Sequence, residues 1–279
     1  MRGLKAQAIL LVGLCMIGGC SSMKPGSVAS VQPYSDKPLA GNAYLLRGFL
    51  GIWSTGIDNL GKKIEANGIR AEVYQEKQWR ELAAAIVRNY KNARDPEPLV
   101  LIGHSYGADD ALKIAKELQE HEISVDLIVT LDPVTPPAVP TNVRLCYNIY
   151  QSNALDGLPF FRGVPLEPAS PSARNLVNVN LRTKARHLLE PDTDHFNIEK
   201  NAKVHQEVVT KLREVCPPRA VWAAVRTRPL PPVAATPGAP VAQQQRATRT
   251  VTSTGQKPPR QPQQQQRVGP TASLLDRIP

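Results

Sequence analysis

Five residues near the middle of the chain, Gly103-His104-Ser105-Tyr106-Gly107, place a serine between two glycines. A serine hydroxyl becomes a nucleophile for acyl transfer when a neighbouring base activates it. Glycine two residues away on either side removes the Cβ atoms that would clash where a sharp turn brings backbones together. The spacing therefore predicts Ser105 as an acyl-transfer nucleophile at the apex of a tight turn.

The residues around this turn predict a strand before it and a helix after it. Leu99 to Ile102 form an apolar run bounded by a proline, which is typical of a buried strand. Beyond the turn, apolar residues recur at helical spacing at Ala108, Ala111, Leu112, Ala115 and Leu118. The positive end of such a helix points at Ser105, where negative charge develops during acyl transfer.

This strand, turn and helix resemble the nucleophile turn of the α/β-hydrolase family, and Ser105 matches that family's nucleophile. The resemblance implies an α/β fold with a mostly parallel central sheet and helices on both faces, in a small version without a large cap domain. Strand and helix signals alternate along the chain, at 43–46, 58–66, 69–74, 79–90, 126–131, 143–151, 176–181 and 198–215. The proline-rich link 133–142 has no helix signal, which leaves the strand order at that edge open.

Two aspartates compete for the acid that orients the base. Asp132 follows the predicted strand 126–131, so it lies at the same sheet edge as Ser105, and it has the chain order Ser, Asp, His. Its Leu-Asp-Pro context resembles the acid position of pancreatic-lipase-type members. Asp156, one strand later, is the other candidate for the acid. Asp132 also has a purely structural interpretation, as an aspartate in a turn ahead of a proline.

Five histidines compete for the base. His195 lies in a loop between the last predicted strand and the last helix, where the family holds its base, and His187 is the alternative. His104 points away from the nucleophile along the chain. His121 and His205 lie on polar helix faces, which predicts solvated side chains. In the resulting triad Ser105 attacks, His195 moves the proton and Asp132 fixes the imidazole tautomer.

The resemblance also implies a backbone oxyanion hole. One N–H would come from the glycine-containing turn 47–51, at Phe49 or Leu50, and the other from Tyr106, the residue after the nucleophile. The irregular segment 151–174 is either a flap over an apolar acyl pocket or a loop packed on the sheet.

The first 19 residues predict a cleaved targeting segment, because Arg2 and Lys5 precede an apolar run too short to span a membrane. The sequence Ile17-Gly18-Gly19-Cys20 resembles a bacterial lipoprotein signal, in which the cysteine is lipidated and becomes the mature N-terminus. The resemblance implies a protein of the bacterial cell envelope, anchored through Cys20 and facing the periplasm or the exterior. An ordinary secretory signal or a membrane anchor is the alternative.

Charge is unevenly distributed along the chain. The net charge is +10, of which +8 belongs to residues 217–279, while residues 20–216 are neutral. The segment 217–279 is rich in Pro and Gln, which predicts a disordered tail. Its positive charge favours anionic envelope surfaces as partners. We predict a tether at 20–39 and one hydrolase domain at 40–216.

Cysteine usage leaves two residues for the mature domain, Cys146 and Cys216, since Cys15 is removed with the signal. Outside the cytosol they either form a disulfide or remain two buried thiols. No His or Cys pair has metal-ligand spacing and no phosphate-binding loop occurs, so we expect no cofactor, no metal and no nucleic-acid partner.

The sequence predicts a serine hydrolase that cleaves a small-molecule or lipid acyl ester, and thioester or amide hydrolysis uses the same residues. The alternative from another class is a binding or structural lipoprotein that keeps the fold without catalysis. A third interpretation is an envelope-polymer anchor whose tail is the functional part.

Overall fold

A six-stranded sheet forms the centre of the protein, for which a computed structural model describes residues 25–48, 55–151 and 163–226. Its strands are β1 (Asn42–Leu46), β2 (Arg70–Tyr74), β3 (Leu99–His104), β4 (Leu127–Leu131), β5 (Cys146–Tyr150) and β6 (Leu176–Asn180). The order is β2-β1-β3-β4-β5-β6, and every neighbouring pair is parallel. The predicted parallel sheet is confirmed.

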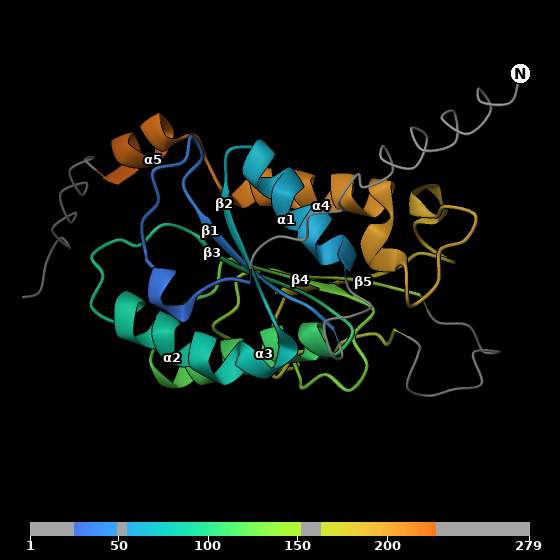
Figure 1. Ribbon diagram of the computed structural model, residues 1–279. Helices are drawn as coiled ribbons and strands as arrows, with labels where there is room; N and C mark the ends of the chain where they lie inside the picture. Colours follow the sequence, from blue (N-terminus) through green and yellow to red (C-terminus); the bar gives the residue numbers. More distant parts are fainter. Residues whose placement is uncertain (1–24, 49–54, 152–162, 227–279) are drawn as a thin grey trace, which may run out of the picture. The chain divides into compact units, whose positions relative to one another are not determined.

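Helices cover both faces of this sheet (Figure 1). The α-helices are α1 (Thr55–Ala66), α2 (Trp79–Tyr90), α3 (Tyr106–Glu120), α4 (Ala202–Val215) and α5 (Arg219–Arg226). Short 3₁₀ helices are η1 (Val28–Ser30), η3 (Glu76–Gln78), η4 (Arg186–Leu188) and η5 (Ile198–Lys200). No helix within the described ranges is long and apolar enough to cross a membrane.

Strand alternation divides the core into two layers. Along β3, Leu99 and Leu101 face α2 and α3, whereas Val100 and Ile102 face α1 and α4. Successive side chains of a strand point to opposite faces, so a strand buried on both sides must be apolar at every position. The continuous apolar run before Ser105 follows from this requirement.

The connection from β4 to β5 contains no helix, as the proline-rich link predicted. The strand order nevertheless stays regular, and two asparagine side chains bond backbone carbonyls in and around this link. Asn142 Nδ2 donates to the carbonyls of Ala115 and Ile123, and Asn175 Nδ2 donates to those of Pro140 and Val143. These bonds hold the link against the end of α3.

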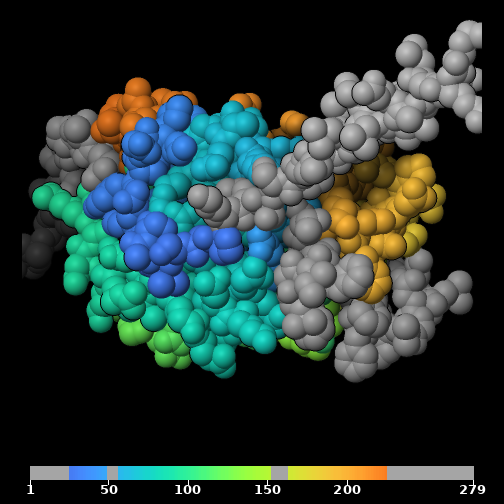
Figure 2. Space-filling model, in the orientation of Figure 1, coloured from blue at the N-terminus to red at the C-terminus, as the bar shows by residue number. Residues whose placement is uncertain are grey.

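The predicted tether is wrong for residues 25–39, which pack on the domain (blue in Figure 2). The Gly26 N–H donates to the Val73 carbonyl at 2.7 Å, and Val31 is buried in the core. The segment has almost no secondary structure of its own, so composition suggested a free linker. Its polar groups are satisfied instead by β2 and by the tyrosines of the sheet.

The predicted disordered tail is wrong for residues 217–226, because α5 lies there. Arg219 is bound by residues far away in the sequence: its Nη1 donates to Glu97 Oε1 at 2.6 Å, and its Nε donates to the Lys37 carbonyl at 2.8 Å. Glu97 is buried and also accepts from the Gly41 N–H at 2.9 Å. The Glu97 side of this ion pair is buried and the Arg219 side is partly exposed, and together with the Lys37 bond it holds the segment after α4 against the start of the domain. Residues 227–279 lie outside the described residues.

Cys146 and Cys216 are both free and buried, so the disulfide alternative is wrong and the two-thiol alternative holds. Cys146 belongs to the core layer with α2 and α3, whereas Cys216 belongs to the layer with α1 and α4. Because the sheet separates the two layers, the two sulfur atoms do not meet.

Candidate active site

The nucleophile turn joins β3 to α3 and holds Ser105 in a strained conformation. Ser105 has φ 56° and ψ −126°, a region that L-residues avoid, and its N–H donates to the Leu131 carbonyl at 2.9 Å. A Cβ on Gly103 would lie 2.1 Å from the Gly107 carbonyl oxygen, and one on Gly107 would lie 2.5 Å from that of Leu46. Both glycines are therefore required by close backbone contacts.

His195 lies beside the serine, in the loop between η4 and η5. Its Nε2 is 3.0 Å from Ser105 Oγ, and its side chain is almost entirely buried. The following residues explain how the loop ends: Asn201 caps α4 by accepting from the Lys203 and Val204 N–H groups. The predicted helix 198–215 is consequently divided at Asn201 into η5 and α4. The structure thus brings together the serine and the histidine predicted from the sequence.

Asp132 follows β4 directly and faces the other ring nitrogen of His195. Its Oδ2 is 3.4 Å from His195 Nδ1, and its Oδ1 accepts from the Gln151 N–H at 2.7 Å. A Cβ on Gly163 would lie 2.1 Å from Asp132 Oδ1, so only glycine fits against this carboxylate. Burial raises the pKa of Asp132, while its contacts with His195 and Gln151 act in the opposite direction.

A second buried aspartate, Asp109 of α3, supports the loop that carries Asp132. Its carboxylate accepts from the N–H groups of Val134 and Thr135 at 3.0 and 2.8 Å, and from the Thr135 hydroxyl at 3.1 Å. By its position in the sequence, Asp109 is an acidic residue in the first turn of α3. The structure adds that it fixes the backbone two residues beyond Asp132.

The remaining predicted residues have mixed outcomes. Tyr106, the predicted oxyanion-hole donor, is the first residue of α3, whereas Phe49, Leu50 and Asp156 lie outside the described residues. His187 is exposed on η4. His104 does not simply point away from the site, because its ring lies 5.4 Å from that of His195, centroid to centroid.

His205 is buried, so the predicted solvated side chain is wrong. His205 Nδ1 lies 3.0 Å from Lys63 Nζ, and His205 Nε2 lies 2.6 Å from the Glu199 carbonyl oxygen. An ammonium group only donates and a carbonyl only accepts, so the proton of neutral His205 is on Nε2. The histidine thereby links α1 and α4 to η5, close in sequence to His195.

Two buried histidines predict that stability falls in acid. Burial lowers the pKa of His205 to about 4 and that of His104 to about 3. The unfolded chain protonates both near their usual pKa of 6.5, so it binds more protons and stability is lost as pH falls from 6.5 toward 4. Burial raises the pKa of Glu199 to about 7. The folded protein therefore binds a proton there that the unfolded chain does not, so Glu199 adds stability as pH falls from 7 to 4.5.

The His205→Gln variant isolates one of these contributions, because glutamine keeps a donor for the Glu199 carbonyl but does not titrate. Between pH 7 and pH 4.5 we expect the free energy of unfolding of the variant to fall by about 2 kcal/mol less than that of the wild type. Urea titrations at the two pH values measure the difference. Equal losses in both proteins would contradict the expectation.

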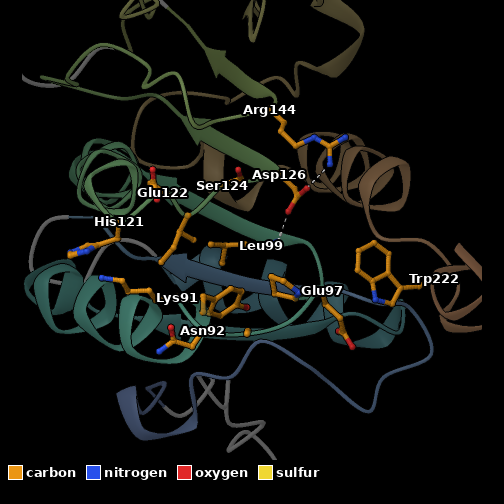
Figure 3. Close-up of a pocket in the computed structure, with 14 residues that line it drawn as sticks. Lys91, Asn92, Glu97, Leu99, His121, Glu122, Ser124, Asp126, Arg144 and Trp222 are labelled. Carbon is orange, nitrogen blue, oxygen red and sulfur yellow. Dashed lines mark hydrogen bonds and ion pairs between the residues drawn. The ribbon is translucent and has the colours of Figure 1, made fainter. Parts of the chain in front are cut away.

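A cavity of about 580 Å³ lies at the other end of the sheet (Figure 3). Leu99 opens β3 and Asp126 precedes β4, so this cavity lies at the amino ends of the strands. Ser105 and Asp132 follow the carboxyl ends, where sites of parallel sheets lie. The cavity is therefore separate from the Ser105 site. Within the described ranges, no cluster of three or more His, Cys, Asp or Glu side chains is arranged to hold a metal ion.

A parallel sheet with helices on both faces and a strained serine between β3 and α3 is an α/β-hydrolase-like fold, and no large cap domain occurs among the described residues. The histidine that contacts this serine and the aspartate that faces the histidine come in the chain order typical of the fold. No protein-family model and no curated protein sequence matches the chain.

Solved structures similar to this chain are α/β hydrolases and esterases. A putative hydrolase of the α/β superfamily from Xanthomonas campestris is 17% identical, with 61% of this chain and 99% of that chain covered and a TM-score of 0.36. The esterase domain of a Rhodothermus marinus protein is 15% identical, with 66% and 90% covered and a TM-score of 0.41. An α/β serine hydrolase without lid from Xanthomonas campestris is 15% identical, with 69% and 87% covered and a TM-score of 0.39.

Proposed function

We propose that the protein is a serine hydrolase that cleaves carboxylic esters through Ser105, His195 and Asp132. The observation that carries this proposal is the 3.0 Å contact between Ser105 Oγ and His195 Nε2, at a serine with φ 56°. A strained nucleophile beside a buried imidazole is the arrangement that removes a hydroxyl proton during attack.

The reaction has two halves. Ser105 Oγ attacks the ester carbonyl while His195 Nε2 takes its proton, and His195 then gives this proton to the leaving alcohol, which leaves an acyl-serine. Water, deprotonated by His195, attacks the acyl carbonyl, and the proton returns to Ser105 as the acid departs. Asp132 keeps the Nδ1 proton of His195 facing it, and the Tyr106 N–H stabilises the oxyanion.

A fluorophosphonate probe tests the proposal, because it forms a covalent bond only with an activated serine. We expect the purified full-length protein to be labelled in a 1:1 ratio and Ser105→Ala to be unlabelled. Activity on a series of esters, thioesters and amides then separates the three substrate classes. A folded wild-type protein that is not labelled would overturn the proposal in favour of a binding protein.

Phe196 supports an apolar substrate. This large apolar side chain follows the base directly and is 46% exposed. Its ring packs edge-on against the His195 ring, with 5.6 Å between the two ring centroids. Its exposed surface is available to the alkyl part of an ester. Phe196→Ala should lower kcat/KM for octanoate esters about tenfold relative to acetate esters, since burying apolar area contributes only with the longer chain.

Val177→Ala is the matched control for Phe196→Ala, because Val177 is another exposed apolar residue, 42% exposed on β6. We expect this variant to leave the octanoate-to-acetate ratio unchanged. The ratio is measured by initial rates on purified proteins. Equal loss of both activities in Phe196→Ala would show that the ring supports His195 rather than the substrate.

For the cellular location we propose that Cys20 is lipidated and anchors the protein to a membrane of the bacterial envelope, facing the periplasm or the exterior. The Ile17-Gly18-Gly19-Cys20 sequence supports this. We expect Cys20→Ala to abolish incorporation of labelled palmitate and membrane sedimentation. Incorporation that persists in the variant would overturn the anchor.

We also propose that residues 227–279 bind anionic envelope surfaces, because they hold seven basic residues and one acidic residue. Deletion of this segment should weaken binding to vesicles that contain phosphatidylglycerol. Unchanged binding would overturn this role.

A further inference from the structure

His104 is a buried titratable residue that no proton-transfer step uses. It is the last residue of β3, directly before Ser105, and is only 3% exposed. A buried imidazole needs a specific partner, because desolvating a polar group without a hydrogen bond is unfavourable.

The alternation of β3 fixes the direction of its side chain. Val100 and Ile102 face the core layer of α1 and α4, and His104 is the next residue of the same parity. The loop that carries His195 crosses this face, since Leu188 before it and Ile198 after it belong to the same layer. The strand therefore directs His104 toward the base loop while Ser105 lies at the turn.

The contact is a hydrogen bond to the backbone of the base. His104 Nε2 lies 2.8 Å from the His195 carbonyl oxygen, and because a carbonyl only accepts, Nε2 carries the proton. The rings lie 5.4 Å apart with an interplanar angle of 41°. Burial lowers the pKa of His104 to about 3, so the ring stays neutral and adds no positive charge beside the imidazolium that forms on His195.

We propose that His104 is a positioning residue that fixes the backbone of His195, so that two adjacent residues hold the base at two points. Ser105 Oγ contacts the ring at Nε2, and His104 holds the carbonyl of the same residue. The inference rests on the proposed hydrolase function, because only a catalytic His195 needs this precision.

The base loop has no regular secondary structure, and its first part is held from the start of α4, where Asn201 Nδ2 donates to the Leu188 carbonyl and to Thr193 Oγ1. Residues 189–197 form no helix or strand, and the backbone bonds around the base are local, such as that from the Ile198 N–H to the Asp194 carbonyl. The bond from His104 connects this loop to a central strand, 91 residues away in sequence. Misplacement of a catalytic group by about 1 Å can lower a rate about 100-fold, so one such bond affects the chemical step.

Three substitutions at one position test the proposal. His104→Gln keeps a neutral donor at the place of Nε2, His104→Asn has the same amide on a side chain one methylene shorter, and His104→Leu has no donor. The full-length proteins are treated with the fluorophosphonate probe, and the maximal labelling rate is separated from the probe concentration that gives half of it. Thermal unfolding is recorded for each protein.

We expect His104→Asn and His104→Leu to lower the maximal labelling rate about 10- to 100-fold, with the half-saturating concentration within about twofold of the wild type. His104→Gln should stay within about threefold. A purely structural role would lower the unfolding temperature of the Asn and Leu variants while folded molecules kept the wild-type rate, which would overturn the proposal.

The Gln and Asn variants test the role of His104 even if His104→Leu does not fold, because they carry the same amide on side chains that differ by one methylene. Equal labelling rates in these two variants would overturn the role of His104 while leaving the hydrolase function intact. A wild-type protein that is not labelled at all would overturn the hydrolase function, and the role of His104 with it.

Discussion

Replacement of His195 by glutamine is expected to lower kcat by about 10⁵- to 10⁶-fold. Glutamine has nearly the reach of the imidazole and a hydrogen-bonding end, but it takes up no proton at neutral pH. Ser105 Oγ, which lies 3.0 Å from His195 Nε2, would then attack without a base. The rate of ester hydrolysis and of fluorophosphonate labelling measures the loss, with thermal unfolding as the check on folding.

His187→Gln is the matched control for His195→Gln, because His187 is the alternative base that the sequence offers and it is exposed on η4. We expect this variant to keep the wild-type rate within about twofold, as is usual for exposed positions away from a site. If His195→Gln kept more than a tenth of the wild-type activity, or if His187→Gln lost its activity, His195 would not be the catalytic base.

The nucleophile turn could be predicted because its causes are local. The apolar run of β3, the two glycines and the apolar spacing of α3 lie within about 20 residues, and each reflects a contact of the backbone nearby. The helix α2 was predicted at its observed bounds, Trp79–Tyr90, for the same reason. Local pattern was enough wherever the partner of a residue was its own strand, turn or helix.

The errors concern residues whose partners are far away in sequence. His104 does leave β3 on the side away from Ser105, but what lies on that side is a loop 91 residues later. Arg219 belongs to a segment with the composition of a free tail, yet its partner Glu97 lies 122 residues earlier. His205 is on a helix face that its neighbours make polar, and Lys63 and Glu199 cover it. Composition and periodicity cannot predict contacts between residues so far apart in sequence.

Asp132→Asn is expected to lower kcat about 10⁴-fold while the protein stays folded. The amide oxygen replaces Oδ1 as the acceptor of the Gln151 N–H, which directs the NH₂ group at His195 Nδ1. Nδ1 must then accept, so the ring proton moves to Nε2, and an Nε2–H cannot take the proton of Ser105. Because burial raises the pKa of Asp132, a neutral amide of the same shape removes an unfavourable buried charge.

Asp109→Asn serves as the control, since Asp109 is also a buried aspartate near the end of β4. For this variant we expect a loss of stability with little loss of rate, the reverse of Asp132→Asn. Its carboxylate accepts from three donors of Val134 and Thr135, and an amide NH₂ there would meet a donor. We expect a loss of about 2 kcal/mol in the free energy of unfolding with a much smaller fall in kcat per folded molecule. Denaturant unfolding and the labelling rate, measured on both variants, separate the two roles. If Asp132→Asn lost stability and kept its rate, Asp132 would be a structural residue and the acid would have to come from elsewhere in the chain.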